Sequence, residues 1–211
     1  MNNAQSYYES RFTFNSGRSV VWKAIAEFLN KFTPRNASVL DLGCGYGDFI
    51  NNISAEHKYA IDLNPDNSQF MNKDVHFFGA SVLDKFPIQD ESLDIVFASN
   101  LLEHFDDGEL AIIMSNVKRC LKPGGRFIVM QPNYYYCFRE YWDDYTHKKA
   151  FSHTAITDFF RSSGLTIEKV IPRFMPFSLK SRLPKSYWLT RFYLNSPIRP
   201  FAKQMLVVAS K

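Results

Sequence analysis

The chain has 211 residues, of which 45% are hydrophobic, 16% aromatic and 22% charged, and its formal net charge is +4. This length suits a single domain with a sizeable core, and no stretch approaches the roughly 18 uninterrupted apolar residues of a membrane-spanning helix. The first residues lack the basic-then-apolar pattern of a signal peptide. The three cysteines are isolated and form neither a metal-ligand spacing nor a disulfide framework. We therefore expect a protein of the reducing cytoplasm.

An amphipathic helix is the first predicted element. Seven apolar residues recur on one face with a period of 3.6 residues; they are Val20, Val21, Ala24, Ile25, Phe28, Leu29 and Phe32. The pattern predicts a helix that precedes the first strand.

The most informative stretch is residues 39–47, which read Val-Leu-Asp-Leu-Gly-Cys-Gly-Tyr-Gly. An apolar run that leads directly into alternating glycines predicts a strand followed by a tight turn. Because glycine permits positive φ and has no Cβ, a ligand can approach this backbone closely. Apolar residues at positions 49, 50 and 53 predict a helix after the turn. Such a βαβ unit is where an open α/β sheet binds a nucleotide-like cofactor.

The glycines do not match the phosphate-binding fingerprints. In the dinucleotide pattern G-x-G-x-x-G, counted from Gly43, the third glycine would stand where Asp48 stands, and no Gly-Lys-Ser/Thr ending of a P-loop follows. Asp41 would repel a pyrophosphate but suits a cofactor that carries an ammonium and a sulfonium group. The pattern D-x-G-x-G-x-G resembles motif I of the class I S-adenosylmethionine (SAM) methyltransferases. A glycine-rich loop without a ligand is the alternative.

Later segments follow the order of that family. A second strand over 57–61 ends in Asp62, about 20 residues after Gly43, where a carboxylate can accept both ribose hydroxyls. Further strands are predicted over 75–78, 94–98, 127–131, 165–171 and 205–209, with a Pro-Gly-Gly turn at 123–125 and a helix from Ser152. The resemblance covers residues 36–171. It is to small-molecule methyltransferases of the ubiquinone-biosynthesis and polysaccharide-cluster types.

This resemblance implies an α/β fold: a Rossmann-like, doubly wound, seven-stranded sheet with an antiparallel last strand and helices on both faces. Residues 1–211 are expected to form one SAM-dependent methyltransferase domain. Within it, residues 1–35 would be an N-terminal cap helix region and residues 173–203 an insertion between the last two strands. The implied cofactor is SAM, with S-adenosyl-L-homocysteine as its product.

The family also implies cofactor contacts. An acidic residue after strand three often binds the adenine amino group there; Ser81 takes this place here, with Val82 next, or Asp84 serves through a shifted loop. The expected cofactor-binding residues are Arg18, Asp41, Gly43, Gly45, Gly47, Asp62, Leu63, Ser81, Val82 and Asn100.

In many relatives the N-terminal helix caps the cofactor pocket. Arg18 could bind the methionine carboxylate bidentately, since a guanidinium suits a carboxylate. Tyr7, Tyr8 and Arg11 could also contact it. A surface position on an amphipathic helix is the alternative for each.

Methyl transfer from a sulfonium is an in-line displacement, so the protein mainly aligns the reacting atoms. A hydroxyl acceptor also needs a base, usually histidine near neutral pH. His104, just past strand four, and His147, after strand five, are the predicted catalytic residues; a surface or structural histidine is the alternative. In relatives of the ubiquinone-biosynthesis type, carboxylates near this region bind a metal together with the residue at Glu103. Asp143, Asp144 and His147 could do the same, but their spacing is poor evidence, and no metal is predicted.

An aromatic run over residues 134–142 follows strand five. We interpret it as a lid over the substrate, with simple packing as the alternative. The expected substrate-side residues are Glu103, Tyr134, Trp142 and Tyr145.

The C-terminal part is basic and aromatic. From Lys169 to Lys211 there are nine Lys or Arg and no Asp or Glu, and Pro176, Pro184, Pro197 and Pro200 exclude a long helix. Such a segment suits an anionic membrane surface, a phosphorylated lipid carrier or a nucleic acid. The alternative is a solvated cationic face whose aromatic side chains pack on the core.

The expected acceptor follows from analogy. DNA amino-methyltransferases of the family carry Asn/Asp-Pro-Pro-Tyr/Phe where residues 99–102 read Ser-Asn-Leu-Leu, so no nucleic-acid partner is expected. Polysaccharide-cluster relatives imply O-methylation of a small hydroxyl acceptor, such as a sugar of a glycan that can be lipid-linked. The alternatives are O- or C-methylation of a quinone-type or small aromatic metabolite, and a non-catalytic SAM-binding or membrane-associated protein. Cytoplasmic location is expected, with peripheral membrane contact through residues 173–203; the sequence does not predict the oligomeric state.

Overall fold

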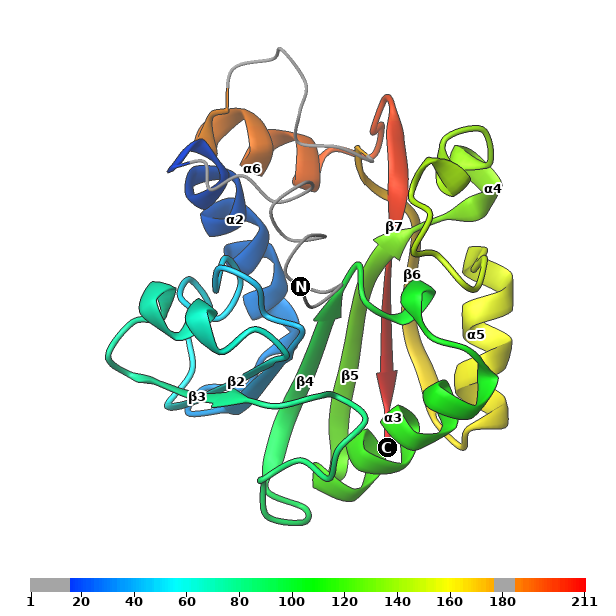
Figure 1. The fold of residues 1–211 in the computed structure, drawn as a ribbon. Helices are drawn as coiled ribbons and strands as arrows, with labels where there is room; N and C mark the ends of the chain where they lie inside the picture. The colour runs from blue at the N-terminus through cyan, green and yellow to red at the C-terminus, as the bar shows by residue number, and fades with distance from the viewer. Residues whose placement is uncertain (1–15, 177–184) are drawn as a thin grey trace.

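Seven strands form one sheet in the order β3-β2-β1-β4-β5-β7-β6 in the computed structural model, which describes residues 16–176 and 185–211 (Figure 1). All pairings are parallel except those of β7, which runs antiparallel to β5 and β6. The strands are β1 (Ser38–Leu42), β2 (His57–Asp62), β3 (Val75–Gly79), β4 (Leu93–Ser99), β5 (Leu121–Pro132), β6 (Thr166–Pro176) and β7 (Ala202–Ser210). The predicted doubly wound sheet with an antiparallel last strand is confirmed.

Helices cover both faces, as predicted. On one face α2 (Ser16–Leu29) and α6 (Tyr187–Asn195) lie together; on the other lie α3 (Asp107–Cys120) and α5 (His153–Ser162) (Figure 1). Each face has its own apolar core, because residues along buried strands alternate between the two sides. The shorter helices are η1 (Asn30–Phe32), η2 (Pro65–Phe70), η3 (Leu102–His104), α4 (Tyr134–Cys137) and η4 (Tyr141–Asp143).

The prediction of a regular helix after the glycine loop is wrong, because residues 48–53 form turns instead. The Ile53 N–H donates to the Phe49 carbonyl at 3.0 Å, as in a helix, but the Asp48 carbonyl accepts the side-chain amide of Asn52 at 2.9 Å. That amide competes with the backbone N–H that would continue the helix. Phe49 nevertheless packs in the same core as α2.

The segment between β6 and β7 is shorter than the predicted insertion of residues 173–203, because β6 extends to Pro176 and β7 begins at Ala202. Its helix α6 packs on α2: the Tyr187 hydroxyl donates to the Glu27 carboxylate, which also pairs with Arg191 at 3.0 Å. Leu194 of α6 is fully buried. No helix within residues 16–176 and 185–211 has the length and apolar character needed to cross a bilayer.

Candidate functional site

The sheet order reverses beside β1, so the carboxyl ends of β1, β2, β4 and β5 meet at one edge. In open α/β sheets this edge is where ligands bind. The glycine loop, the loop after β4 and the loop after β5 all begin there.

The three glycines of the loop differ in what surrounds them. Gly43, Gly45 and Gly47 all have positive φ, at 64°, 51° and 71°. A Cβ on Gly43 would lie 2.8 Å from a Leu101 methyl group, and one on Gly47 2.9 Å from the Met71 side chain, whereas nothing lies within 4 Å at Gly45. Packing therefore requires two of the glycines, and Gly45 alone borders open space into which a ligand can come.

Asp62 ties this loop to the end of β2. One carboxylate oxygen accepts the Gly45 N–H at 2.8 Å and the other accepts the Asn64 N–H at 2.9 Å. A carboxylate offers about four lone-pair sites, so both bonds are compatible with accepting ribose hydroxyls. The predicted ribose ligand is thus placed beside the open glycine.

Asp41 places a buried carboxyl group inside the loop. Its side chain is buried, and burial raises its pKa well above the usual range; the nearby carboxylates of Asp62 and Asp48 raise it further, while the Ile50 N–H lowers it. A buried carboxyl group surrounded by carboxylates gains from a cation and repels a phosphate. This charge pattern fits the ammonium and sulfonium of SAM.

Arg18 pairs with Asp48. The Asp48 oxygen Oδ2 lies 3.0 Å from Nε and 2.9 Å from Nη2 of the guanidinium. This ion pair joins α2 to the glycine loop, and the capping of a cofactor pocket by the helix stays a prediction. The role of Arg18 toward a methionine carboxylate remains a prediction, and Tyr7, Tyr8 and Arg11 lie outside the described residues.

The loop after β3 brings the two alternatives for adenine binding together. The Ser81 N–H donates to Asp84 Oδ2 at 3.3 Å, and the Ser81 hydroxyl accepts the Leu83 N–H at 3.1 Å. Val82 is buried in the core, and Leu63 at the end of β2 is exposed. The turn therefore places the Asp84 carboxylate at the Ser81 backbone.

Asn100, just past β4, has a left-handed conformation with φ of 50°. Its N–H donates to the Met130 carbonyl at 2.9 Å, and its side-chain oxygen accepts the Gln204 amide at 2.9 Å. Such conformations are uncommon outside glycine and cluster at functional sites. The expected cofactor role of Asn100 stays a prediction.

The predicted histidines come together on the acceptor side. His104 lies in η3 after β4, and His147 lies in the loop after β5; their ring centroids are 5.0 Å apart. The Glu103 carbonyl accepts the backbone N–H groups of Lys148 and Lys149 at 2.8 and 3.1 Å. These bonds hold the two loops together.

Hydrogen bonds define the tautomers of both rings. His147 Nδ1 lies 2.7 Å from the Tyr141 carbonyl, which can only accept, so Nδ1 carries the proton. His104 Nδ1 lies 3.0 Å from the Thr146 hydroxyl, which in turn donates to Asp144 at 2.6 Å. Burial and the neighbouring His147 lower the pKa of His104, which favours its neutral form. In the neutral form of His104 the lone pair therefore lies on Nε2, and His147 carries a proton on Nδ1.

Glu103 is fully buried, and among the described residues neither carboxylate oxygen has a hydrogen-bond partner. Burial raises the pKa of Glu103 to about 8, and Asp144 adds to the rise. Buried carboxyl groups normally have a hydrogen-bond partner or a cation beside them, so the Glu103 carboxyl group calls for an explanation.

The aromatic run divides into a packed part and an exposed part. Tyr141 is fully buried and its hydroxyl donates to the Lys149 carbonyl at 2.7 Å, so it is core rather than lid. Tyr134 meets the Tyr141 ring edge-on at 5.2 Å. Trp142 and Tyr145 are exposed. The role of Tyr134, Trp142 and Tyr145 toward an acceptor stays a prediction.

Two polar residues were missed by the sequence analysis. Thr146 orients His104, as described above, but a threonine in a loop carries no signal of such a role. Gln131 is fully buried near the end of β5, and neither its amide oxygen nor its nitrogen has a partner among the described residues. The sequence signal for Gln131 was its position as a polar residue at the end of an otherwise apolar strand.

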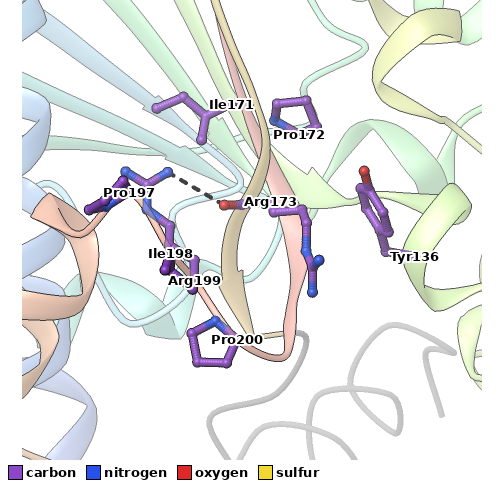
Figure 2. A pocket seen from close by; sticks show the side chains of 8 residues that line it. All are labelled: Tyr136, Ile171, Pro172, Arg173, Pro197, Ile198, Arg199 and Pro200. Atoms are coloured by element: carbon purple, nitrogen blue, oxygen red, sulfur yellow. Dashed lines mark hydrogen bonds between the residues drawn. The ribbon is translucent and has the colours of Figure 1, made fainter.

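A hollow of about 480 Å³ lies at the same edge of the sheet, between the end of β6 and the segment before β7 (Figure 2). The Arg173 guanidinium lies over the Tyr136 ring at 5.1 Å, and Arg199 donates to the Arg173 carbonyl at 3.4 Å. The remaining lining residues are Ile171, Pro172, Pro197, Ile198 and Pro200. The hollow thus combines apolar walls with two guanidinium groups.

Comparisons with known proteins show the family of the chain. Residues 14–170 match the family model for a methyltransferase domain. Phosphoethanolamine N-methyltransferase 1 of Triticum aestivum is 30% identical over 116 residues, which cover 50% of this chain and 22% of that protein. The chain spans about half or less of the length of the curated relatives that it matches.

Solved structures show the same fold. A SAM-dependent methyltransferase from Archaeoglobus fulgidus superposes over 100% of both chains with a TM-score of 0.68 and 19% identity. Geranyl diphosphate C-methyltransferase from Streptomyces coelicolor A3(2), in complex with Mg²⁺, geranyl diphosphate and S-adenosyl-L-homocysteine, superposes with a TM-score of 0.61 and 17% identity over 89% of this chain and 79% of that one. The match to the family model over most of the chain, together with this fold, shows that the chain belongs to the SAM-dependent methyltransferases.

Proposed function

We propose that the protein transfers the methyl group of SAM to a hydroxyl oxygen of a sugar in a lipid-linked glycan. The observation that carries the oxygen assignment is the pair of imidazoles that the loops after β4 and β5 bring together, His104 and His147. A hydroxyl must lose its proton to be methylated, whereas an amine with its lone pair need not.

In this mechanism SAM supplies a methyl group that is already activated by its sulfonium. Asp62 would hold the ribose, Asp41 would face the positive charge, and Gly45 would let the cofactor approach the backbone. Nε2 of His104 or His147 takes the proton of the acceptor hydroxyl while the oxygen–methyl bond forms. The electron pair of the broken sulfur–methyl bond remains on sulfur, which gives S-adenosyl-L-homocysteine. The aligned geometry would lower the barrier by several kcal/mol.

The acceptor class is inferred from the basic, aromatic surface beside the site. On α6, Trp188, Leu189 and Phe192 are exposed, and Ile198 and Phe201 follow before β7. No acidic residue occurs between Lys169 and Lys211. Exposed aromatic side chains among basic ones suit an anionic lipid surface, and the hollow with Arg173 suits a phosphate group. These features support a lipid-linked acceptor at the inner face of the cytoplasmic membrane.

A transfer assay with isotopically labelled SAM tests the proposal. Lipid-linked oligosaccharides, free sugars, quinone precursors and phosphoethanolamine would be offered separately, with His104→Gln and His147→Gln as test variants and His57→Asn as the matched control outside the site. We expect label to enter the saccharide as an alkali-stable methyl ether. Transfer to a quinone precursor or to an amine, with none to saccharides, would overturn the acceptor assignment.

A further inference from the structure

We propose that the hollow beside the end of β6 binds the phosphate group of a phosphate ester. Its two charged lining residues are Arg173 and Arg199, and the described residues that line it include no acid (Figure 2). Within residues 16–176 and 185–211 neither arginine pairs with a carboxylate, whereas Arg191 on the neighbouring α6 pairs with Glu27 at 3.0 Å. Two guanidinium groups in one hollow repel each other, and an anion bound there offsets the repulsion.

Arg173 has the donors that a phosphate group needs. Its guanidinium lies over the Tyr136 ring at 5.1 Å, and its Nε donates to the Ala202 carbonyl at 3.4 Å. Among the described residues its terminal nitrogens, Nη1 and Nη2, have no hydrogen-bond partner. The Tyr136 ring is itself supported, because it stacks on His153 with the ring centroids 6.2 Å apart. A guanidinium held on a ring with its two terminal nitrogens available suits bidentate binding of a phosphate.

An irregularity of β6 gives Arg173 its position. Ile171 pairs with Leu206 of β7 and Met175 pairs with Gln204, so residues 172–174 lie opposite Met205 alone. Such a bulge bends the strand and changes the direction of its side chains, and bulges occur preferentially at sheet edges and beside functional sites. β6 is an edge strand. The bulge therefore places Arg173 in the wall of the hollow.

Arg199 adds a second, fixed positive charge. Its Nη2 donates to the Leu194 carbonyl at 2.7 Å and its Nη1 to the Arg173 carbonyl at 3.4 Å. Its Nε is buried and has no partner within the described part of the chain. Burial also lowers the pKa of this guanidinium, because removal from water disfavours its charged form. A phosphate in the hollow would stabilise that charge.

The other walls fit the organic part of an ester. Ile171, Pro172, Pro197, Ile198 and Pro200 surround the two guanidinium groups. Ile198 is 76% exposed, and Phe201 beyond the hollow is 80% exposed. An alkyl or prenyl chain on the phosphate would cover these apolar groups, and their removal from water favours binding. We therefore expect a phosphate on an apolar chain to bind more tightly than phosphate alone.

The identity of the ester as the methyl acceptor rests on the proposed function, whereas phosphate binding does not. β6 runs in the same direction as β4, and β5 and β7 lie between them. Neighbouring strands are about 4.8 Å apart, so the hollow lies about 14 Å along the sheet edge from the end of β4. His104 follows β4. The acceptor would thus carry its phosphate about 14 Å from the hydroxyl that is methylated.

Calorimetric titration tests phosphate binding without any acceptor. The probes are octyl phosphate, octanol, a sugar phosphate and inorganic phosphate. We expect octyl phosphate to bind most tightly and to bind Arg173→Gln at least about tenfold more weakly, since a hydrogen bond between charged groups is lost. Arg173→Lys, which keeps the charge and loses the planar fork, should lie between them. Arg139→Gln is the matched control, because Arg139 lies over the Phe138 ring at 5.7 Å and does not line the hollow.

Titration with SAM shows that each variant is folded. Arg199→Gln replaces an Arg173 variant that does not bind SAM. A wild type that binds none of the phosphates, octanol that binds as tightly as octyl phosphate, or Arg173→Gln that binds like the wild type would overturn the proposal. Tighter binding of the sugar phosphate, lost in Arg173→Gln, would support the phosphate site and make a soluble ester its ligand.

The link to methyl transfer has its own readout. With a phosphate-bearing saccharide as acceptor, Arg173→Gln should raise the KM at least about tenfold relative to Arg139→Gln, and with the dephosphorylated saccharide the two variants should share one KM. An equal rise for both acceptors would overturn the assignment of the phosphate to the acceptor. If phosphate binds but no hydroxyl is methylated, the proposed function fails and the phosphate site stands. If hydroxyl methylation proceeds while no phosphate binds, the reverse holds.

Discussion

The rings of His104 and His147 lie with their centroids 5.0 Å apart, although the two residues follow different strands. The contact depends on the main chain, because the Glu103 carbonyl accepts the N–H groups of Lys148 and Lys149 and so joins the two loops. The histidine pair is therefore assembled by tertiary packing rather than by one sequence motif.

Replacing either histidine tests whether the pair acts as a unit. We expect His104→Gln and His147→Gln each to lower kcat by about 10²–10⁴-fold, the usual range for loss of proton transfer. The double variant should lose little more, because residues that act together are not additive. Steady-state kinetics with the identified acceptor measures this, and SAM affinity and His57→Asn serve as controls. Additive losses would contradict a shared role.

The glycine loop offers a matched pair of variants. Gly45→Ala meets no protein atom, so its cost to folding is that of a left-handed alanine, about 1–2 kcal/mol or roughly 2–8 °C in Tm. Gly47→Ala also meets the Met71 side chain at 2.9 Å and should unfold at a lower temperature. We expect Gly45→Ala to lose SAM binding while it stays folded, as measured by calorimetric titration and thermal unfolding. Normal SAM affinity in Gly45→Ala would place the cofactor elsewhere.

Asp41 links cofactor binding to pH. Burial, together with Asp62 and Asp48, raises its pKa in the protein without cofactor, so its carboxyl group stays protonated at pH values where an ordinary Asp is ionised. A cationic cofactor favours the carboxylate, so SAM binding should release a proton there, and affinity should rise with pH up to the raised pKa. Calorimetric titrations in buffers with different ionisation enthalpies measure the released proton. Asp41→Asn should abolish it, and a heat that is independent of buffer would rule out the linkage.

The same shift has a consequence for stability. A carboxyl group whose pKa is higher in the folded state binds more protons there, so its contribution to stability falls as pH rises from the ordinary pKa of Asp toward the raised one. Without SAM, Asp41→Asn should therefore gain stability relative to the wild type over this pH range. Urea unfolding at several pH values measures the difference in the free energy of unfolding between Asp41→Asn and the wild type. A difference that shrinks with rising pH would contradict the prediction.

The sheet could be predicted because its signals are local. The strands are short apolar runs that end at glycine turns or at single acidic residues, as in β1 and β2. The irregular turns after the glycine loop were not predicted, because the Asn52 side chain takes the carbonyl that a helix would use. A hydrophobic period of 3.6 does not report that competition.

The site was predictable to the extent that each motif carries its own chemistry. Asp41, Gly45 and Asp62 were predicted as cofactor-binding residues from the motif that they form, and they lie together at one edge of the sheet. The Arg18–Asp48 pair was missed, because Asp48 was considered only as a mismatch to a dinucleotide fingerprint. The unpartnered state of Glu103 was also beyond prediction, since it depends on how two distant loops exclude water.

The exposed face of α6 provides the test of membrane contact. Trp188 and Phe192 are 69% and 77% exposed, so Trp188→Ser and Phe192→Ser should change folding stability by less than about 0.5 kcal/mol. Ile112→Ser on α3, at a position 47% exposed, is the matched control on the opposite face of the sheet. We expect co-sedimentation with anionic vesicles to fall in the α6 variants and not in the control. It should also weaken with salt, because ions screen the attraction of basic side chains to the surface. Equal sedimentation of all three variants and the wild type would exclude α6 as the membrane contact. Binding to neutral and anionic vesicles alike would exclude a role of the basic side chains in that contact.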